Sequence, residues 1–526
     1  MKMTQNNREF VNKIYIHTYK TNLRLIQILS STPCSIAIKN ISKSNSILIT
    51  DLISCNQWLE LAKEQALLKC KKLSPVYAIP SLLQAINDSY YGKSRKTLIK
   101  FGIAIKLTLA LVAENVYEPS RTDPSKRAED IADAIQSVFL FHQLFLMHPI
   151  FQLHYEIGDF IELTPVGISK MSENIREINS EYFIAYAKRG ELHRTLEAVL
   201  ENVWQNPLLF KEAILNILGG QCPKDQTIFA SNIFGAIPAN ADKEFWIGLL
   251  GRIDLLLLAG QHDHSMNEPL RGYAIFELPA GRLFPVYENT DDANIMENLF
   301  WNQSWYKRKR NDDAEHMIVE RPALQISQKR NLFATSFLAV GDSLNWYVEA
   351  SVLPYPDSGG VSLPDTVFNK MISEPFEKDV CSLFRNHGFI AGKVTAKGTW
   401  KPNDTVIDLS PLSQASIPGE IDVLAFNKDY NIAWLSECKV LSYPFSSNRM
   451  RNLLSKLNET DSEAFHAKLN KKMLWLKENK HFNDDTYWVK TLVIDRPLPR
   501  INQNKNFMTF DLVTLENAIK EAIKNA

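Results

Sequence analysis

Residues 354–364 read Pro-Tyr-Pro-Asp-Ser-Gly-Gly-Val-Ser-Leu-Pro and concentrate turn-forming residues in one short stretch. Proline removes a backbone N–H, and glycine loses more conformational entropy on ordering than other residues, so such a stretch interrupts helices and strands. It therefore predicts a linker at 354–365 and a chain of separate domains. The length of 526 residues agrees, since domains commonly span about 150 residues.

In the chain before this linker, the pattern of apolar residues changes once. Residues 50–220 repeat apolar side chains at helical spacing, and Gly219-Gly220 ends the last of these patterns. We therefore expect a mainly α-helical N-terminal domain at 1–224. Short apolar segments then predict a mixed α+β middle domain at 225–353. Its expected strands are Arg271–Leu278, Arg282–Tyr287 and Trp346–Leu353.

The chain after the linker, 366–526, alternates helical and strand patterns. This order predicts an α/β domain with three layers and a mixed sheet, so the whole chain is expected to be multidomain. The expected helices are Ser373–Asn386, a long region of about Arg449–Lys480, and Leu515–Asn525. The expected strands are Ile421–Phe426, Ile432–Leu441, Tyr487–Asp495 and Phe507–Phe510, with a hairpin turn at 427–431 joining the first two.

Composition excludes several classes of protein. The six cysteines show no C-x-x-C spacing, which argues against a zinc ribbon and is typical of reduced thiols in the cytoplasm. The longest apolar stretches, 101–113 and 138–151, are too short and too polar to span a bilayer. We therefore expect a cytoplasmic protein without a membrane segment. The 59 Lys and Arg balance the 59 Asp and Glu, so nucleic-acid binding would need a local basic patch.

Charged residues interrupt the two strands of the expected hairpin. Asp422 lies in the first strand, and Glu437-Cys438-Lys439 lie in the second. Side chains alternate across a strand, so Glu437 and Lys439 share one face and can meet Asp422 across the hairpin. Two carboxylates suit Mg²⁺ or Mn²⁺, which polarise phosphoryl oxygens, and an ammonium group can orient water. Charges alternating along a strand are usually solvated, but the apolar neighbours 433–435 and 440–441 predict burial, which favours a functional role.

From Ile372 to the C-terminus the sequence resembles the PD-(D/E)xK nuclease superfamily, which has the restriction-endonuclease-like fold. The resemblance rests on Glu377 in a helix, on Gly419-Glu420-Ile421-Asp422, and on Glu437-Cys438-Lys439. It implies a magnesium or manganese site at Asp422 and Glu437, with Glu377 and Glu420 as further ligands. It also implies catalytic roles for Asp422, Glu437, Lys439 and Glu377, with Lys439 assisting the attacking water. The literal Pro-Asp pair is missing, because Pro418 lies four residues before Asp422.

Two basic segments are candidates for nucleic-acid binding. Residues 449–480 carry eight Lys and Arg against four Asp and Glu, and Lys468, Lys471 and Lys472 fall near one helical face. Trp305 and Tyr306 precede a run of four cations, where aromatic rings can stack on bases while the cations hold phosphates. These cations are Lys307, Arg308, Lys309 and Arg310. A solvated helix face and an exposed loop are the alternative interpretations of the two segments.

The function expected from these features is that of a metal-dependent endonuclease acting on DNA, with RNA as the alternative substrate. The layout resembles bacterial restriction or antiviral defence effectors, in which residues 1–350 would recognise a target, a protein partner or a signal. Their apolar helices also offer a homodimer surface. Two alternatives stay open: a nuclease-like domain that binds nucleic acid without cutting it, and a sensor protein whose N-terminal region does the biological work.

Overall fold

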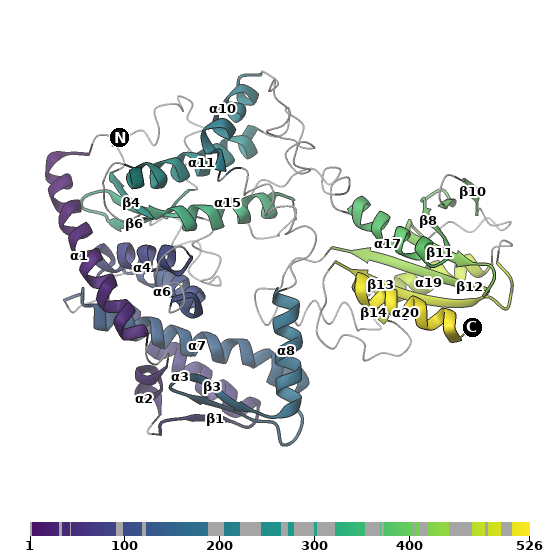
Figure 1. Cartoon of the computed structure of the whole chain (residues 1–526), viewed down its shortest axis with the longest axis horizontal. Coiled ribbons are helices and arrows are strands. Elements are labelled where there is room, and N and C mark those ends of the chain that lie inside the picture. The colour runs from purple at the N-terminus through teal and green to yellow at the C-terminus, as the bar shows by residue number, and fades with distance from the viewer. Residues whose placement is uncertain are drawn as a thin grey trace. The chain divides into compact units, whose positions relative to one another are not determined.

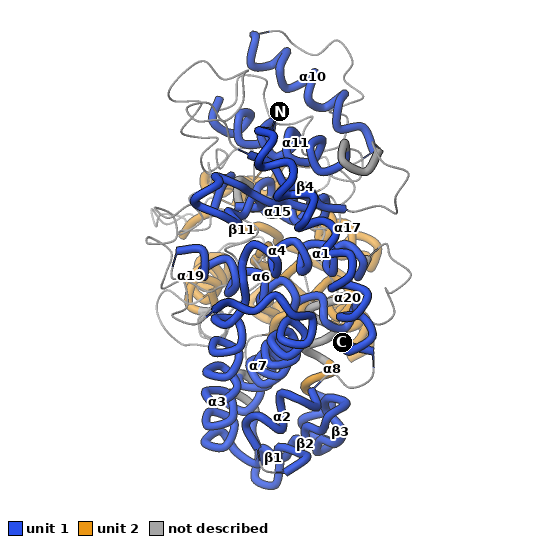
Figure 2. The backbone as a smooth tube through the Cα atoms, turned by 90° about the vertical axis from the view of Figure 1, so that its left-hand side faces the viewer, with its two compact units in different colours: residues 1–177, 196–363 blue, residues 178–195, 364–526 orange. Residues whose placement is uncertain are grey.

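A computed structural model of the chain places two compact units, shown separately coloured in Figure 2. Unit 1 comprises residues 1–177 and 196–363, and unit 2 comprises residues 178–195 and 364–526. The residues that the structure describes are 3–30, 34–42, 44–90, 98–117, 123–187, 203, 205–220, 243–264, 272–277, 299–301, 321–352, 369, 373–402, 405–409, 418–440, 465–478, 482–495 and 508–525. The predicted linker 354–365 and the predicted strand Arg282–Tyr287 lie outside these residues.

The N-terminal part of the chain is helical, as expected (Figure 1). Its helices are α1 (Gln5–Leu29), α2 (Ser35–Ile41), α3 (Leu52–Lys71), α4 (Pro75–Tyr90), the short 3-10 helix η1 (Ile99–Phe101), α6 (Gly102–Glu114), α7 (Ala128–His154), α8 (Glu173–Ala187) and α10 (Pro207–Leu218). Buried residues of α1, α4, α6 and α7 form one core. The same core contains Tyr273 and Leu324 from the region after residue 225, so both regions share it within unit 1.

Helix α7 is long and apolar enough to cross a membrane by length and composition alone, over Ala128–Gln152. The helix is longer than the apolar stretch 138–151 that was noted in its sequence. However, 65% of its apolar window is buried inside the protein, and it packs against α1, α3 and α6. A core helix of this kind passes the same test, so the finding is weak evidence for a membrane span.

Unit 1 also holds two small sheets. The first has the order β1 (Ile47–Ile49), β2 (Ile161–Thr164), β3 (Gly167–Met171), all antiparallel, and was missed because these strands are short. The second has the order β4 (Tyr273–Glu277), β7 (Leu332–Ser336), β6 (Ala323–Ser327), β5 (Phe300–Trp301). Helices α11 (Lys243–His264) and α15 (Phe337–Val352) pack against each other beside it. The prediction of a strand at Trp346–Leu353 was wrong, because residues 346–352 belong to α15, whose buried Val340, Leu344 and Val348 recur every four residues.

Unit 2 contains one seven-stranded mixed sheet, as the sequence predicted in outline. Its order is β10 (Ile407–Asp408), β9 (Thr399–Pro402), β8 (Ile390–Val394), β11 (Ile421–Asn427), β12 (Ile432–Lys439), β13 (Tyr487–Ile494), β14 (Met508–Phe510). The β12–β13 and β13–β14 pairs are parallel, and the other pairs are antiparallel. Strands β8, β9 and β10 were not predicted.

Helices cover both faces of this sheet. Helices α17 (Glu374–Asn386) and α20 (Leu512–Asn525) share a core with Val423, Trp434 and Cys438. Helix α19 (Phe465–Lys477) contacts β12 and β13, and its Lys472 reaches Glu437, which alternates with Cys438 along β12. Successive side chains of a strand point to opposite faces, so α19 lies on the face opposite α17 and α20. Of the predicted helical region 449–480, the structure describes residues 465–478.

Candidate active site on strands β11 and β12

The hairpin of β11 and β12 brings the predicted acidic residues together. Its antiparallel register pairs Val423 with Ser436, so the next pair along the strands places Asp422 opposite Glu437. The carboxylate of Glu437 points to the face covered by α19, where it meets Lys472. A local sequence signal sets this register: the side chain of Asn427 accepts hydrogen bonds from the backbone N–H groups of Asp429 and Tyr430 and thereby closes the turn.

An irregularity in the sheet lies directly beside Asp422. The register between β11 and β8 shifts between Ile421 and Leu424. Bulges of this kind re-aim side chains and are common next to functional sites. Asp422 Oδ2 here accepts the backbone N–H of Cys438 at 2.8 Å, which fixes the carboxylate against the second strand of the hairpin.

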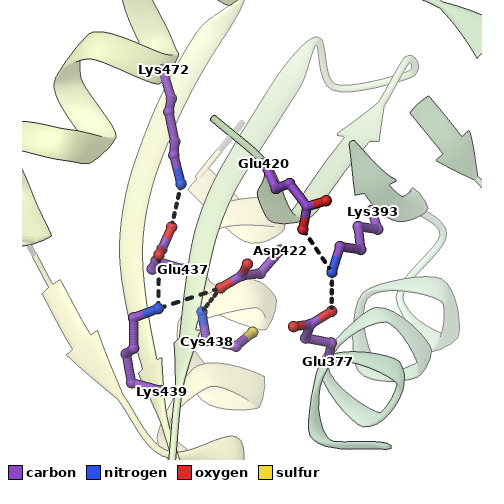
Figure 3. A network of polar contacts seen from close by, with 8 residues as sticks. All are labelled: Glu377, Lys393, Glu420, Asp422, Glu437, Cys438, Lys439 and Lys472. Atoms are coloured by element: carbon purple, nitrogen blue, oxygen red, sulfur yellow. Dashed lines mark hydrogen bonds and ion pairs between the residues drawn. The ribbon is translucent and has the colours of Figure 1, made fainter. Parts of the chain in front are cut away.

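Glu437 lies between two ammonium groups (Figure 3). Lys439 Nζ donates to Glu437 Oε1 at 2.8 Å and also lies 3.9 Å from Asp422 Oδ2. Lys472 Nζ, from α19, donates to Glu437 Oε2 at 2.6 Å. Each oxygen of Glu437 therefore holds one lysine, and Lys439 bridges the two carboxylates of the hairpin.

A second ionic group stands next to the first one in Figure 3. Lys393, on β8, lies 3.3 Å from Glu377 Oε2 and 3.2 Å from Glu420 Oε2. Glu377 comes from the first turn of α17, and its side chain is mostly buried, whereas that of Glu420 is half exposed. Glu377 and Glu420 are thus joined through Lys393 rather than through Asp422.

The charges of the hairpin shift one another's protonation. Burial and the negative charge of Glu437 raise the pKa of Asp422 above its ordinary value. Burial would also raise the pKa of Glu437, but Lys439 and Lys472 outweigh it and hold that pKa below its ordinary value. Burial likewise opposes the charge of Lys439, yet Glu437 and Asp422 overcome it and raise the pKa of Lys439. Glu437 and Lys439 are therefore both ionised at neutral pH.

Glu377 is a mostly buried carboxylate whose pKa lies well above its ordinary value. Burial, and secondarily the charge of Asp422, raise its pKa to about 7 from 4.5. Below pH 4.5 the folded and unfolded chains are both protonated at this residue. Between pH 4.5 and about 7 the unfolded chain ionises while the folded chain keeps its proton, so stability is lost across this window and stays lower above it.

The substitution Glu377→Gln removes this titration. It is expected to stabilise unit 2 by on the order of 1 kcal/mol at pH 8 and to leave its stability unchanged near pH 4. Hydrogen exchange of the α17 and β11 amides at both pH values measures the effect. Glu521→Gln, an exposed carboxylate of α20 in the same unit, is the control. A stabilisation equal at both pH values would contradict the assignment.

The donor chemistry of the hairpin fits a divalent cation. In the described ranges, no group of three or more His, Cys, Asp or Glu side chains is arranged to hold a metal ion. The four carboxylates predicted as ligands are therefore not gathered around one point. Asp422 and Glu437 nevertheless form a pair of mostly buried carboxylates, in which burial and then the charge of Glu437 raise the pKa of Asp422. Mg²⁺ is commonly held by one or two carboxylates with water and substrate phosphate, so this pair is the part of the set that fits.

The residues predicted to bind nucleic acid differ in their exposure to solvent. Lys468 and Lys471 are exposed on α19. Lys472 is only 7% exposed and binds Glu437, so it does not belong to a surface stripe. Consecutive helical residues are turned by about 100° from each other, which separates Lys472 from its neighbour Lys471. The basic run 307–310 lies outside the described residues.

Sequence reasoning missed two contributors to the site. Lys393 was missed because β8 itself was not predicted. The neighbouring Gly392 is a signal for this strand, because a Cβ at residue 392 would lie 1.9 Å from the backbone oxygen of Lys401. Only glycine permits that close approach of two strands. The backbone N–H of Cys438 carries no sequence signal.

A scan of protein-family models gives no match to this chain, and neither curated proteins nor solved structures match it.

Proposed function

We propose that unit 2 is a divalent-metal-dependent nuclease with a restriction-endonuclease-like fold that hydrolyses phosphodiester bonds of DNA. The observation that carries the proposal is the bridging of Asp422 and Glu437 by Lys439, with Nζ 3.9 Å from one carboxylate and 2.8 Å from the other. A buried pair of carboxylates with an ammonium between them is costly unless it is paired or functional. Mg²⁺ or Mn²⁺ bound there would polarise a phosphoryl oxygen and acidify water.

The chain's own residues have distinct roles in this proposal. Asp422 and Glu437 would hold the ion, and the backbone N–H of Cys438 keeps Asp422 oriented. The Lys439 ammonium would donate a hydrogen bond to the attacking water or to the developing negative charge on the phosphate. Glu377, beside this pair, would contribute a further carboxylate once released from Lys393.

A second candidate function is nucleic-acid binding without cleavage. It is favoured by one observation: Asp422 and Glu437 are matched in number by Lys439 and Lys472, so this group is balanced without a metal ion. Such a domain would bind nucleic acid in a salt-sensitive way and show no divalent-ion affinity at the hairpin.

Residues 1–350 are proposed to recognise a target, a protein partner or a signal, or to form a homodimer, in a cytoplasmic defence or restriction effector. Helices of unit 1 share a large apolar core with strands of its second sheet, which is consistent with a separate binding module. Expressing residues 1–353 alone tests whether this region carries the biological activity. Full activity in that fragment would contradict a required nuclease centre.

Cleavage assays decide between the two candidates. We expect the full chain to cut plasmid DNA in Mg²⁺ or Mn²⁺ and to be inactive in EDTA, with single-stranded DNA and RNA assayed in parallel. Asp422→Ala and Lys439→Ala should abolish cleavage while retaining nucleic-acid binding. Cleavage that survives both changes would remove the site assignment, and salt-sensitive binding without any cleavage would favour the second candidate.

The exposed lysines of α19 make a separate prediction about binding. The double variant Lys468→Met/Lys471→Met is expected to weaken DNA binding and to reduce the slope of log K against log salt by about 1 to 2. The physical reason is that each lost phosphate contact no longer releases a counterion. Fluorescence anisotropy at several salt concentrations measures this slope. Lys397→Met/Lys428→Met, two exposed lysines in strand-connecting turns, is the matched control and should leave the slope unchanged.

A further inference from the structure

Lys472 is the most buried cation of the candidate site. It is 7% exposed and lies in α19, where its neighbours along the helix, Leu469 and Leu476, are fully buried. Burying an ammonium group costs several kcal/mol unless a counter-charge is present. Its ion pair with Glu437 Oε2, at 2.6 Å, supplies that charge.

This ion pair engages Glu437 Oε2, a carboxylate oxygen that a metal ion at this site would need as a ligand. Glu437 Oε1 accepts from Lys439, and Oε2 accepts from Lys472. Of these two lysines, Lys439 is the one that also approaches Asp422, at 3.9 Å. Lys472 contributes one positive charge next to Glu437 and cancels the negative charge that would attract a cation to the pair.

We propose that Lys472 is an internal counter-ion that competes with a divalent cation for Glu437. This inference rests on the proposed function, because it concerns the same pair of carboxylates. Its consequence is a site that binds a free ion weakly. The anionic phosphodiester then restores the missing negative charge, so ion and substrate bind together.

The test measures Mn²⁺ binding to the full chain by calorimetry. Lys472→Met removes the charge and keeps the length of the side chain, and Lys472→Gln removes the charge but keeps a hydrogen-bond donor. Both are expected to tighten Mn²⁺ binding by about tenfold or more, since a like charge near the ion is lost. Lys472→Arg should stay within about twofold of the wild type. Lys477→Met, an exposed lysine of the same helix, is the matched control and should also stay within about twofold.

A second measurement addresses the coupling between ion and substrate. Mn²⁺ binding to the wild type should tighten by about tenfold in the presence of uncleavable phosphorothioate DNA, and this gain should shrink in Lys472→Gln. By thermodynamic reciprocity, Mn²⁺ must tighten DNA binding by the same factor.

The possible outcomes distinguish the counter-ion proposal from the nuclease proposal. Unchanged or weaker Mn²⁺ binding in both neutral variants overturns the counter-ion. Tighter binding in these variants, with no cleavage of any nucleic acid by the wild type, supports the counter-ion and contradicts the nuclease. Absence of Mn²⁺ binding in the wild type and in every variant overturns both.

Discussion

Replacing Lys439 with methionine is expected to lower the rate of DNA cleavage at saturating Mg²⁺ by about 10²- to 10³-fold, the usual cost of removing one group that stabilises developing charge. Its ammonium contacts Glu437 at 2.8 Å and also lies 3.9 Å from Asp422. Methionine has a similar length, so the packing of the side chain over the Phe465 ring, where Nζ lies 5.6 Å from the centroid, is largely retained. Single-turnover cleavage of a labelled duplex measures the change.

A matched control accompanies this variant. Lys428 lies in the exposed turn of the same hairpin and contacts no residue of the site, so Lys428→Met should cleave at the wild-type rate. DNA binding by Lys439→Met should stay within about threefold of the wild type, because the lost interaction is expected in the transition state. Equal cleavage rates for the two variants would contradict the role of Lys439.

Replacing Trp434 with alanine is expected to destabilise unit 2 by about 3–5 kcal/mol, the range observed for large-to-small changes in aromatic core residues. Trp434 is 2% exposed, and its ring centroid lies 5.5 Å from that of Phe384. It joins β12 to α17 on the face opposite Glu437. Loss of this contact should therefore loosen the strand that carries Glu437 and Lys439.

Hydrogen exchange in the β11 and β12 amides measures this loss within unit 2. Tyr487→Ala is the control, because Tyr487 lies on the neighbouring strand β13 and is 65% exposed. Its free energy of unfolding should change by about 0.5 kcal/mol or less. A Trp434→Ala variant as stable as the control would show that this core does not position the hairpin.

The hairpin could be predicted from sequence because its signals are local. Short runs of apolar residues define β11 and β12, and Asn427 in the intervening turn fixes their register. Once the register is known, the meeting of Asp422 and Glu437 follows from side-chain alternation. The expectation that these charges are buried also follows from the apolar residues around them, and their side chains are 15% and 13% exposed.

The partners of the hairpin could not be predicted, because they depend on long-range packing. From sequence alone, Lys472 is expected to be an exposed lysine of a helix. It is buried because its turn of α19 faces β12. Lys393 comes from β8, whose sequence Ile390–Val394 is short and contains Gly392, so it gives a weak strand signal. The expected strand at Trp346–Leu353 failed for a related reason. Its β-branched and aromatic residues have strand propensity, but packing of α15 against α11 overrides that propensity.

The most direct test of the account is the position of Mn²⁺ in crystals of the full chain. Anomalous diffraction from crystals soaked in Mn²⁺ locates the ion without any assumption about its ligands. We expect a peak roughly 2.0 to 2.2 Å from carboxylate oxygens of Asp422 and Glu437, strengthened in Lys472→Gln and absent in Asp422→Asn. A protein that cleaves DNA in Mn²⁺ but binds the ion elsewhere in the crystal would contradict it.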